Sequence, residues 1–177
     1  RPADTTETIE CWEMALENLN TPSVLALTRQ KLSPVRKEYA KENKCSLGAY
    51  EILRTSEKID LTIFASGSEV NLAVEVSHKL ATQNTHSKVI SVPCQELFDK
   101  QKVDYQTKIL DENKHKISIE ASTTDTWKKY IGNNGISFGL NDFGKSAPYK
   151  DIYKNFKLTV DDIVKSTQEM IKENNQD

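Results

Sequence analysis

The chain has 177 residues, of which 37% are hydrophobic and 28% are charged, and 24 basic residues against 26 acidic ones give a net charge of −2. This length allows one globular domain and part of another, and it excludes a large multidomain enzyme within this chain. The charge balance gives no net field that would attract nucleic acid or an anionic membrane, and the apolar runs are far shorter than the roughly 20 residues that cross a bilayer.

The first predicted element is a helix that begins near Asp4. Asp4 followed by Glu7 is typical of a capping box, in which the first side chain accepts a backbone amide and the glutamate reaches back to the cap. Apolar residues then recur at helical spacing, at Ile9, Trp12, Leu16 and Leu19. The apolar run within residues 23–27 predicts a short strand that is buried on both faces.

A charged stretch with few apolar residues, over positions 32–46, predicts a solvated linker and a domain boundary. The predicted strand over 23–27 has no partner within residues 1–43, so we expect this helix and strand to be the end of another α/β domain. Residues 46–177 then form a second domain. The chain starts at Arg1 and its first methionine is Met14, so we expect it to be a fragment of a longer protein.

After the linker, strands and helices alternate. The apolar patterns predict strands over 49–53, 61–65, 88–92, 116–120 and 137–140. Helices are predicted over 69–82, 96–100, 103–110 and 127–131, and a last one follows the capping pair Thr159 and Asp162. This rhythm predicts an α/β fold with a mostly parallel sheet and helices on both faces.

The residues that could bind metals or act as nucleophiles are scattered. The chain has three widely spaced cysteines, Cys11, Cys45 and Cys94. They lie outside any C-x-x-C pattern, which argues against a disulfide framework or a zinc site and favours a reducing, cytoplasmic setting. The three histidines lack metal or triad spacing and are interpreted as structural or surface residues: His78, His86 and His115. We therefore predict no metal site in this chain.

Two positions are candidates for binding a phosphate group. The segment Gly67-Ser68-Glu69 follows a predicted strand and opens a helix, where phosphates often bind backbone amides. The dinucleotide glycines are missing and the Glu69 carboxylate would repel an anion, so we interpret the segment as a tight turn with Ser68 as the N-cap. Arg29 follows the strand predicted over 23–27, where a guanidinium can grip phosphate in a bidentate way. Position alone also allows an ordinary ion pair of Arg29.

An ordered series of motifs along nearly the whole chain resembles the C-terminal portion of a transketolase. The segments that carry the resemblance include Arg1-Pro2-Ala3-Asp4, Leu27-Thr28-Arg29-Gln30, Gly48-Ala49-Tyr50, Ser66-Gly67-Ser68-Glu69-Val70, Ser91-Val92-Pro93, Glu120-Ala121, Phe143-Gly144 and Ser146-Ala147-Pro148. The resemblance implies that residues 1–43 end a pyrimidine-binding domain and that 46–177 are the C-terminal domain.

The family transfers a two-carbon ketol unit between sugar phosphates of the pentose phosphate pathway, with thiamine diphosphate as cofactor. The resemblance implies that Arg29 binds the substrate phosphate. The family's catalytic residues and its ligands for thiamine diphosphate and Mg²⁺ (or Ca²⁺) have no counterpart here, so we expect no catalytic, cofactor-binding or metal-binding residue in this chain and no activity of the chain alone. The resemblance also implies a cytoplasmic homodimer.

The chain departs from the family pattern at two places. Lys31 stands where an asparagine usually follows the arginine and glutamine, close to the expected phosphate site, and Asn141-Asp142 replaces the usual aspartate-arginine pair. Two alternative interpretations stay open. One is the C-terminal part of a sister thiamine-diphosphate enzyme, such as deoxyxylulose-phosphate synthase or a ketoacid dehydrogenase β chain. The other is a stand-alone dimerisation or regulatory module.

Overall fold

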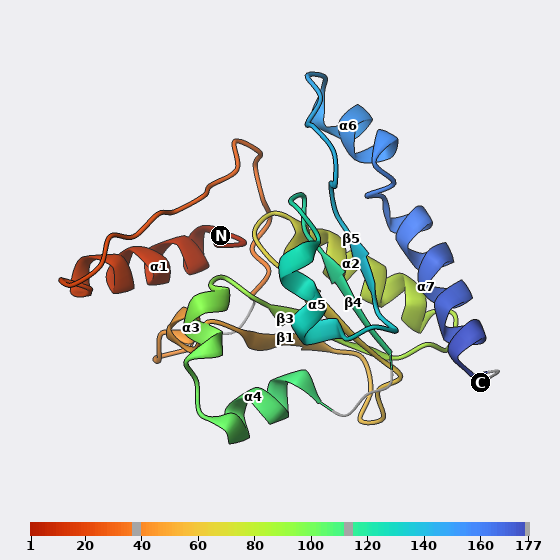
Figure 1. Cartoon of the computed structure of the whole chain (residues 1–177), viewed down its shortest axis with the longest axis horizontal. Helices are drawn as coiled ribbons and strands as arrows, with labels where there is room; N and C mark the ends of the chain where they lie inside the picture. Colours follow the sequence, from red (N-terminus) through yellow and green to blue (C-terminus); the bar gives the residue numbers. More distant parts are fainter. Residues whose placement is uncertain (37–39, 112–114, 176–177) are drawn as a thin grey trace.

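A five-stranded sheet in the order β1-β3-β2-β4-β5 lies at the centre of the computed structural model, which describes residues 1–36, 40–111 and 115–175 (Figure 1). The strands are β1 (Tyr50–Arg54), β2 (Leu61–Ala65), β3 (Ser87–Ser91), β4 (His115–Ile119) and β5 (Ile136–Phe138). Strands β3, β2, β4 and β5 run parallel to one another, and the edge strand β1 pairs with β3 in the antiparallel direction. The predicted mostly parallel α/β fold is confirmed.

Helices cover both faces of this sheet. The long helices α2 (Glu69–Ala81) and α7 (Val160–Asn174) pack on one face, and α3 (Gln95–Asp99), α4 (Val103–Leu110) and α5 (Lys128–Ile131) pack on the other. Because strand residues alternate between faces, Ile63 belongs to the first core and its neighbour Phe64 to the second. Burial on both sides explains why the central strands are apolar throughout.

Local sequence signals fix several helix ends. The Thr159 hydroxyl accepts the amide of Asp162 at the start of α7, as the predicted capping pair requires. Gly48 ends the short 3₁₀-helix η1 (Lys44–Leu47) with φ of 76°, and a Cβ there would lie 2.1 Å from the Phe98 nitrogen. Only glycine combines this left-handed backbone with so close an approach to α3.

The N-terminal part differs from the prediction in one element. Helix α1 (Thr5–Glu17) forms as expected, but residues 23–27 are not a strand. Val24 is 91% exposed, and no neighbouring strand pairs with this stretch among the described residues. An apolar run becomes a strand only where a sheet edge receives its backbone hydrogen bonds, so the segment stays extended and unpaired.

Three short helices of the described residues lie outside the predicted ones. The 3₁₀-helix η1 lies at the end of the stretch expected to be linker, the 3₁₀-helix η2 (Asp125–Trp127) directly precedes α5, and α6 (Tyr149–Asn155) precedes α7. Helix α6 spans only seven residues and fully buries none of them, so its apolar residues, Tyr149, Ile152 and Tyr153, form too short a pattern to predict a helix. None of the helices in the described part of the chain has the length and apolar character needed to span a bilayer.

Candidate functional site

Arg29, the predicted phosphate ligand, lies in an exposed bend of the extended stretch that follows α1. The Thr28 hydroxyl accepts the amide of Gln30 at 3.1 Å, which turns the chain locally around Arg29. Within the described residues, the Arg29 side chain makes no ion pair or hydrogen bond, and Lys31 is also exposed nearby in sequence. The guanidinium therefore presents its donors to solvent, as an anion ligand would.

The stretch before Arg29 folds back along α1 (Figure 1). Between them lies an open groove of about 410 Å³, lined by Trp12, Ala15, Leu16, Thr21, Pro22, Ser23, Leu25 and Leu27. The apolar stripe of α1 faces this side, and its members are exposed: Ile9, Trp12 and Leu16. A surface helix normally buries such a stripe against the core, whereas α1 exposes its apolar side.

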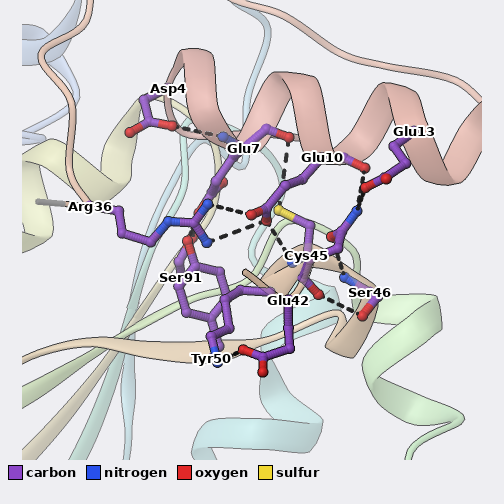
Figure 2. A network of polar contacts seen from close by, with 12 residues as sticks. Asp4, Glu7, Glu10, Glu13, Arg36, Glu42, Cys45, Ser46, Tyr50 and Ser91 are labelled. Atoms are coloured by element: carbon purple, nitrogen blue, oxygen red, sulfur yellow. Dashed lines mark hydrogen bonds and ion pairs between the residues drawn. The ribbon is translucent and has the colours of Figure 1, made fainter. Parts of the chain in front are cut away.

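The buried side of α1 is acidic, and Glu7 is its centre (Figure 2). Glu7 is fully buried and accepts three hydrogen bonds, from the Ala3 amide at 2.6 Å, the Tyr50 hydroxyl at 2.7 Å and the Ser91 hydroxyl at 2.5 Å. Burial raises the pKa of Glu7, and these donors oppose the rise. Because Tyr50 is on β1 and Ser91 on β3, one carboxylate fastens α1 to the sheet.

The predicted capping box is therefore only half formed. Asp4 accepts the Glu7 amide at 2.9 Å, as expected, but Glu7 reaches the amide of Ala3, one residue before the cap, and then the sheet. The other oxygen of Asp4 accepts the amide of Val35 at 2.9 Å. The chain that leaves the Arg29 stretch is thus tied back to the beginning of α1.

Glu10 makes a second attachment one turn further along α1. It forms an ion pair with Arg36 and accepts the Cys45 amide at 3.0 Å, while its backbone carbonyl accepts the Asn43 side chain at 3.0 Å (Figure 2). Burial alone would raise the pKa of Glu10, but the hydrogen bonds from Arg36 and Cys45 outweigh it and lower the pKa. Glu7 and Glu10 together fix α1, and hence the start of the Arg29 stretch.

The carboxyl edge of the parallel strands, where open α/β sheets bind ligands, is occupied by Arg1. Its guanidinium contacts Glu69 at 3.1 Å and Glu120 at 2.6 Å. Glu69 also accepts the Tyr153 hydroxyl at 2.6 Å, and Glu120 accepts the Trp127 indole at 2.8 Å. Two carboxylates that already have donors make this edge unfavourable for an anion.

The segment Gly67-Ser68-Glu69 consequently behaves as a structural turn. Gly67 has φ of 61° and donates its amide to the Arg1 carbonyl at 3.0 Å, where a phosphate would otherwise bind. Ser68 precedes α2 but does not cap it with its side chain, because its hydroxyl donates to Glu69 at 2.6 Å. The predicted tight turn is present with Ser68 at the N-cap position, but the Ser68 side chain makes no capping hydrogen bond.

The remaining candidates do not assemble into a site. Over residues 1–36, 40–111 and 115–175, no three acidic, histidine or cysteine side chains are arranged to hold a metal ion. His78 is exposed, His86 is half-buried and His115 is buried at the start of β4. Sequence reasoning missed the Glu7 and Glu10 attachments, although two acidic residues one turn apart, opposite the apolar stripe, were a signal available in the sequence.

Comparisons with known proteins cover most of the chain. A family model described as "Transketolase-like TK C-terminal domain" matches residues 48–159. A transketolase of Sinorhizobium medicae strain WSM419 is 42% identical over 173 residues, which is 97% of this chain and 25% of that protein. The chain spans about a quarter of the length of the curated relatives that it matches.

Solved structures agree with this match. A transketolase from Leishmania mexicana superposes with a TM-score of 0.88 at 37% identity, over 98% of this chain and 25% of that one. A transketolase variant from Pichia stipitis, described in complex with xylulose 5-phosphate, superposes with a TM-score of 0.88 at 35% identity, over 97% of this chain and 25% of that one.

Proposed function

The chain belongs to the transketolase family, and from this premise we propose that it is the C-terminal part of an enzyme that moves two-carbon ketol units between sugar phosphates. The observation that carries the proposal is the likeness to transketolases over 97% of the chain at 42% identity. The proposed parent uses thiamine diphosphate, works in the pentose phosphate pathway of the cytoplasm and is a homodimer.

Within this enzyme we assign binding of the substrate phosphate to Arg29. Its exposed guanidinium, which has no ion-pair partner among the described residues, supports this role. Arginine is permanently charged and matches phosphate with two parallel hydrogen bonds. Holding the phosphate end of a sugar orients its carbonyl, so binding energy remote from the reacting carbon lowers the barrier. The related Pichia stipitis protein is described with a sugar phosphate, xylulose 5-phosphate.

The described residues do not fit a site for thiamine diphosphate and a divalent metal. They offer no cluster of three metal-ligating side chains, and the one glycine turn at the sheet edge donates its amide to Arg1 and is followed by the Glu69 carboxylate. We propose that the parent binds the cofactor and its Mg²⁺ (or Ca²⁺) with residues outside this chain. The isolated chain is then inactive.

The N-terminal part supports a two-domain division, with residues 1–43 ending a pyrimidine-binding domain and 46–177 forming the C-terminal domain. The apolar stripe of α1 and the unpaired stretch 23–27 are exposed in this chain. In the parent, a sheet of the pyrimidine-binding domain would pair with residues 23–27 and cover the stripe. The apolar stripe of α1 and the stretch 23–27 would then be buried in the core of the pyrimidine-binding domain.

Ketol transfer from xylulose 5-phosphate to ribose 5-phosphate by the full-length parent, with thiamine diphosphate and Mg²⁺ supplied, tests the function. Absence of activity would refute it. For Arg29→Ala, kcat/KM for phosphorylated donors falls by about 100-fold or more, because two charge-assisted hydrogen bonds are worth about 1.5–3 kcal/mol each. An unphosphorylated ketol donor loses little. Lys31→Ala is the matched control for loss of a nearby positive charge, and equal losses for both donors would refute the role of Arg29.

A further inference from the structure

Two cysteines that are far apart in the sequence meet beneath α1. Cys11 on α1 is 9% exposed and Cys45 on η1 is fully buried, and they pack in one cluster with Tyr50. The Cys45 thiol lies 3.8 Å from the Glu7 carbonyl, and in an α-helix this carbonyl accepts the amide of Cys11. The sulfur of Cys45 therefore sits against the turn of α1 that carries Cys11.

The backbone holds this arrangement firmly. The Cys45 amide donates to Glu10 at 3.0 Å, and the Asn43 side chain donates to the Glu10 carbonyl at 3.0 Å. Both bonds join η1 and its N-cap residue to Glu10, the residue before Cys11 on α1. The Cys11 and Cys45 thiols lie within hydrogen-bonding reach of each other, so a bond between the two sulfurs would join neighbouring side chains.

The two thiols are chemically unequal. A hydrogen bond from the Cys45 thiol lowers the pKa of Cys11, and the same bond together with burial raises the pKa of Cys45. Negative charge is thus favoured on Cys11, which is the less buried member of the pair. Cys94 is different, since burial and the nearby Glu96 raise its pKa and it does not belong to the cluster that holds Cys11 and Cys45.

We propose that Cys11 and Cys45 form a reversible disulfide that locks α1 onto the domain that carries the sheet. The Cys11 thiolate attacks one sulfur of a small-molecule disulfide such as glutathione disulfide, and one glutathione thiolate leaves. Cys45 then gives up its proton to that thiolate and attacks the Cys11 sulfur, which releases the second glutathione. Two protein thiols are oxidised by two electrons, and one glutathione disulfide is reduced to two glutathione molecules.

The lock closes a loop from residue 11 to residue 45 that contains Arg29. The disulfide reinforces the contacts by which Glu7 and Glu10 already hold α1. Moving α1 away from the sheet would require the bond between the two sulfurs to break. Oxidation therefore suppresses local opening of α1 without changing its resting position. This role is independent of ketol transfer, and its test needs no activity.

The test uses the 177-residue chain in a series of glutathione buffers from reducing to oxidising. Free thiols are alkylated in acid, the chain is digested without reduction, and the peptides are identified by mass. We expect a peptide pair joined through Cys11 and Cys45 in a buffer that leaves Cys94 alkylated. Amide exchange within α1 should then slow by about tenfold or more relative to the reduced chain.

Variants give the control. Cys94→Ser keeps the crosslink and the slower exchange, whereas Cys11→Ser and Cys45→Ala abolish both. The wild-type peptide map decides the question even if a variant folds poorly. Alkylated Cys11 and Cys45 in a buffer that already converts Cys94 into a mixed disulfide would overturn the proposal, as would crosslinks to Cys94 or between chains in equal yield.

Discussion

Replacing Glu7 with glutamine tests whether a buried carboxylate holds α1 on the sheet. The substitution keeps the shape of the side chain but exchanges one accepting oxygen for an NH₂ group. Each Glu7 oxygen receives donors, one from the Tyr50 and Ser91 hydroxyls and the other from the Ala3 amide. With its oxygen towards the two hydroxyls, the introduced amide turns its NH₂ against the Ala3 amide. With its NH₂ towards the hydroxyls, it can donate to their oxygens, but both hydroxyl protons then lose their acceptor.

The cost follows from the number of donors left without an acceptor. If the oxygen of the introduced amide serves the two hydroxyls, its NH₂ and the Ala3 backbone amide face each other, and a buried donor without a partner costs about 1–3 kcal/mol. The neutral side chain recovers part of this because it is easier to desolvate than a carboxylate. We expect a loss of about 3 kcal/mol, which corresponds to a fall in Tm of about 6–12 °C for a chain of this size.

Thermal and urea unfolding, followed by circular dichroism, measure this difference. Glu17→Gln is the matched control, because Glu17 is exposed on the last turn of the same helix and should change the unfolding free energy by less than about 0.5 kcal/mol. If Glu7→Gln and Glu17→Gln have the same stability, Glu7 does not fasten α1. Tyr50→Phe should lose less than Glu7→Gln, since Ser91 still serves the same oxygen.

Two further predictions concern backbone and charge. Gly48→Ala combines a left-handed φ with a Cβ placed 2.1 Å from the Phe98 nitrogen, so we expect the free energy of unfolding to fall by about 3 kcal/mol or more, or the chain not to fold. Gly144→Ala is the control, because its Cβ meets no atom within 4 Å, and it should be near neutral in urea unfolding. The pKa of Glu10 is lowered from its ordinary value of 4.5. The stability that the ionised Glu10 contributes to the folded chain is therefore fully present above pH 4.5 and is lost as the pH falls through the folded-state pKa. The stability difference between wild type and Glu10→Gln should therefore shrink below about pH 4, and a difference independent of pH would contradict the Arg36 pairing.

Elements that bury an apolar face within this chain could be predicted from sequence. Residues 61–65 form a strand and 103–110 a helix with the predicted bounds, because their apolar spacing matches the surface they cover. The stretch 23–27 has an equally apolar sequence but no sheet to join, so pattern alone misled. Helix α6 is only seven residues long and its apolar side is only partly covered, where Tyr153 packs on the core, so its pattern was too short to predict it.

The polar clusters were harder to predict for a different reason. Arg1, Glu69 and Glu120 meet at one edge of the sheet although they are far apart in the chain, and no local pattern marks such a meeting. The same holds for Cys11 and Cys45, which sequence spacing places far from each other. Arg29 could be singled out from a local motif and a predicted strand end, although that strand does not form in this chain, and the role of Arg29 stays a prediction for the parent enzyme.

The attachment of α1 also bears on how the chain behaves when it is cut. Residues 1–17 are held by Arg1 at the sheet edge, by Glu7 at β1 and β3, and by Glu10 at Arg36 and η1. The stretch between α1 and Val35 contributes few of these bonds and is largely exposed. A nick within it would leave the first helix bound as a separate peptide, so the chain is suited to fragment complementation, in which a synthetic peptide of residues 1–17 rejoins the remainder.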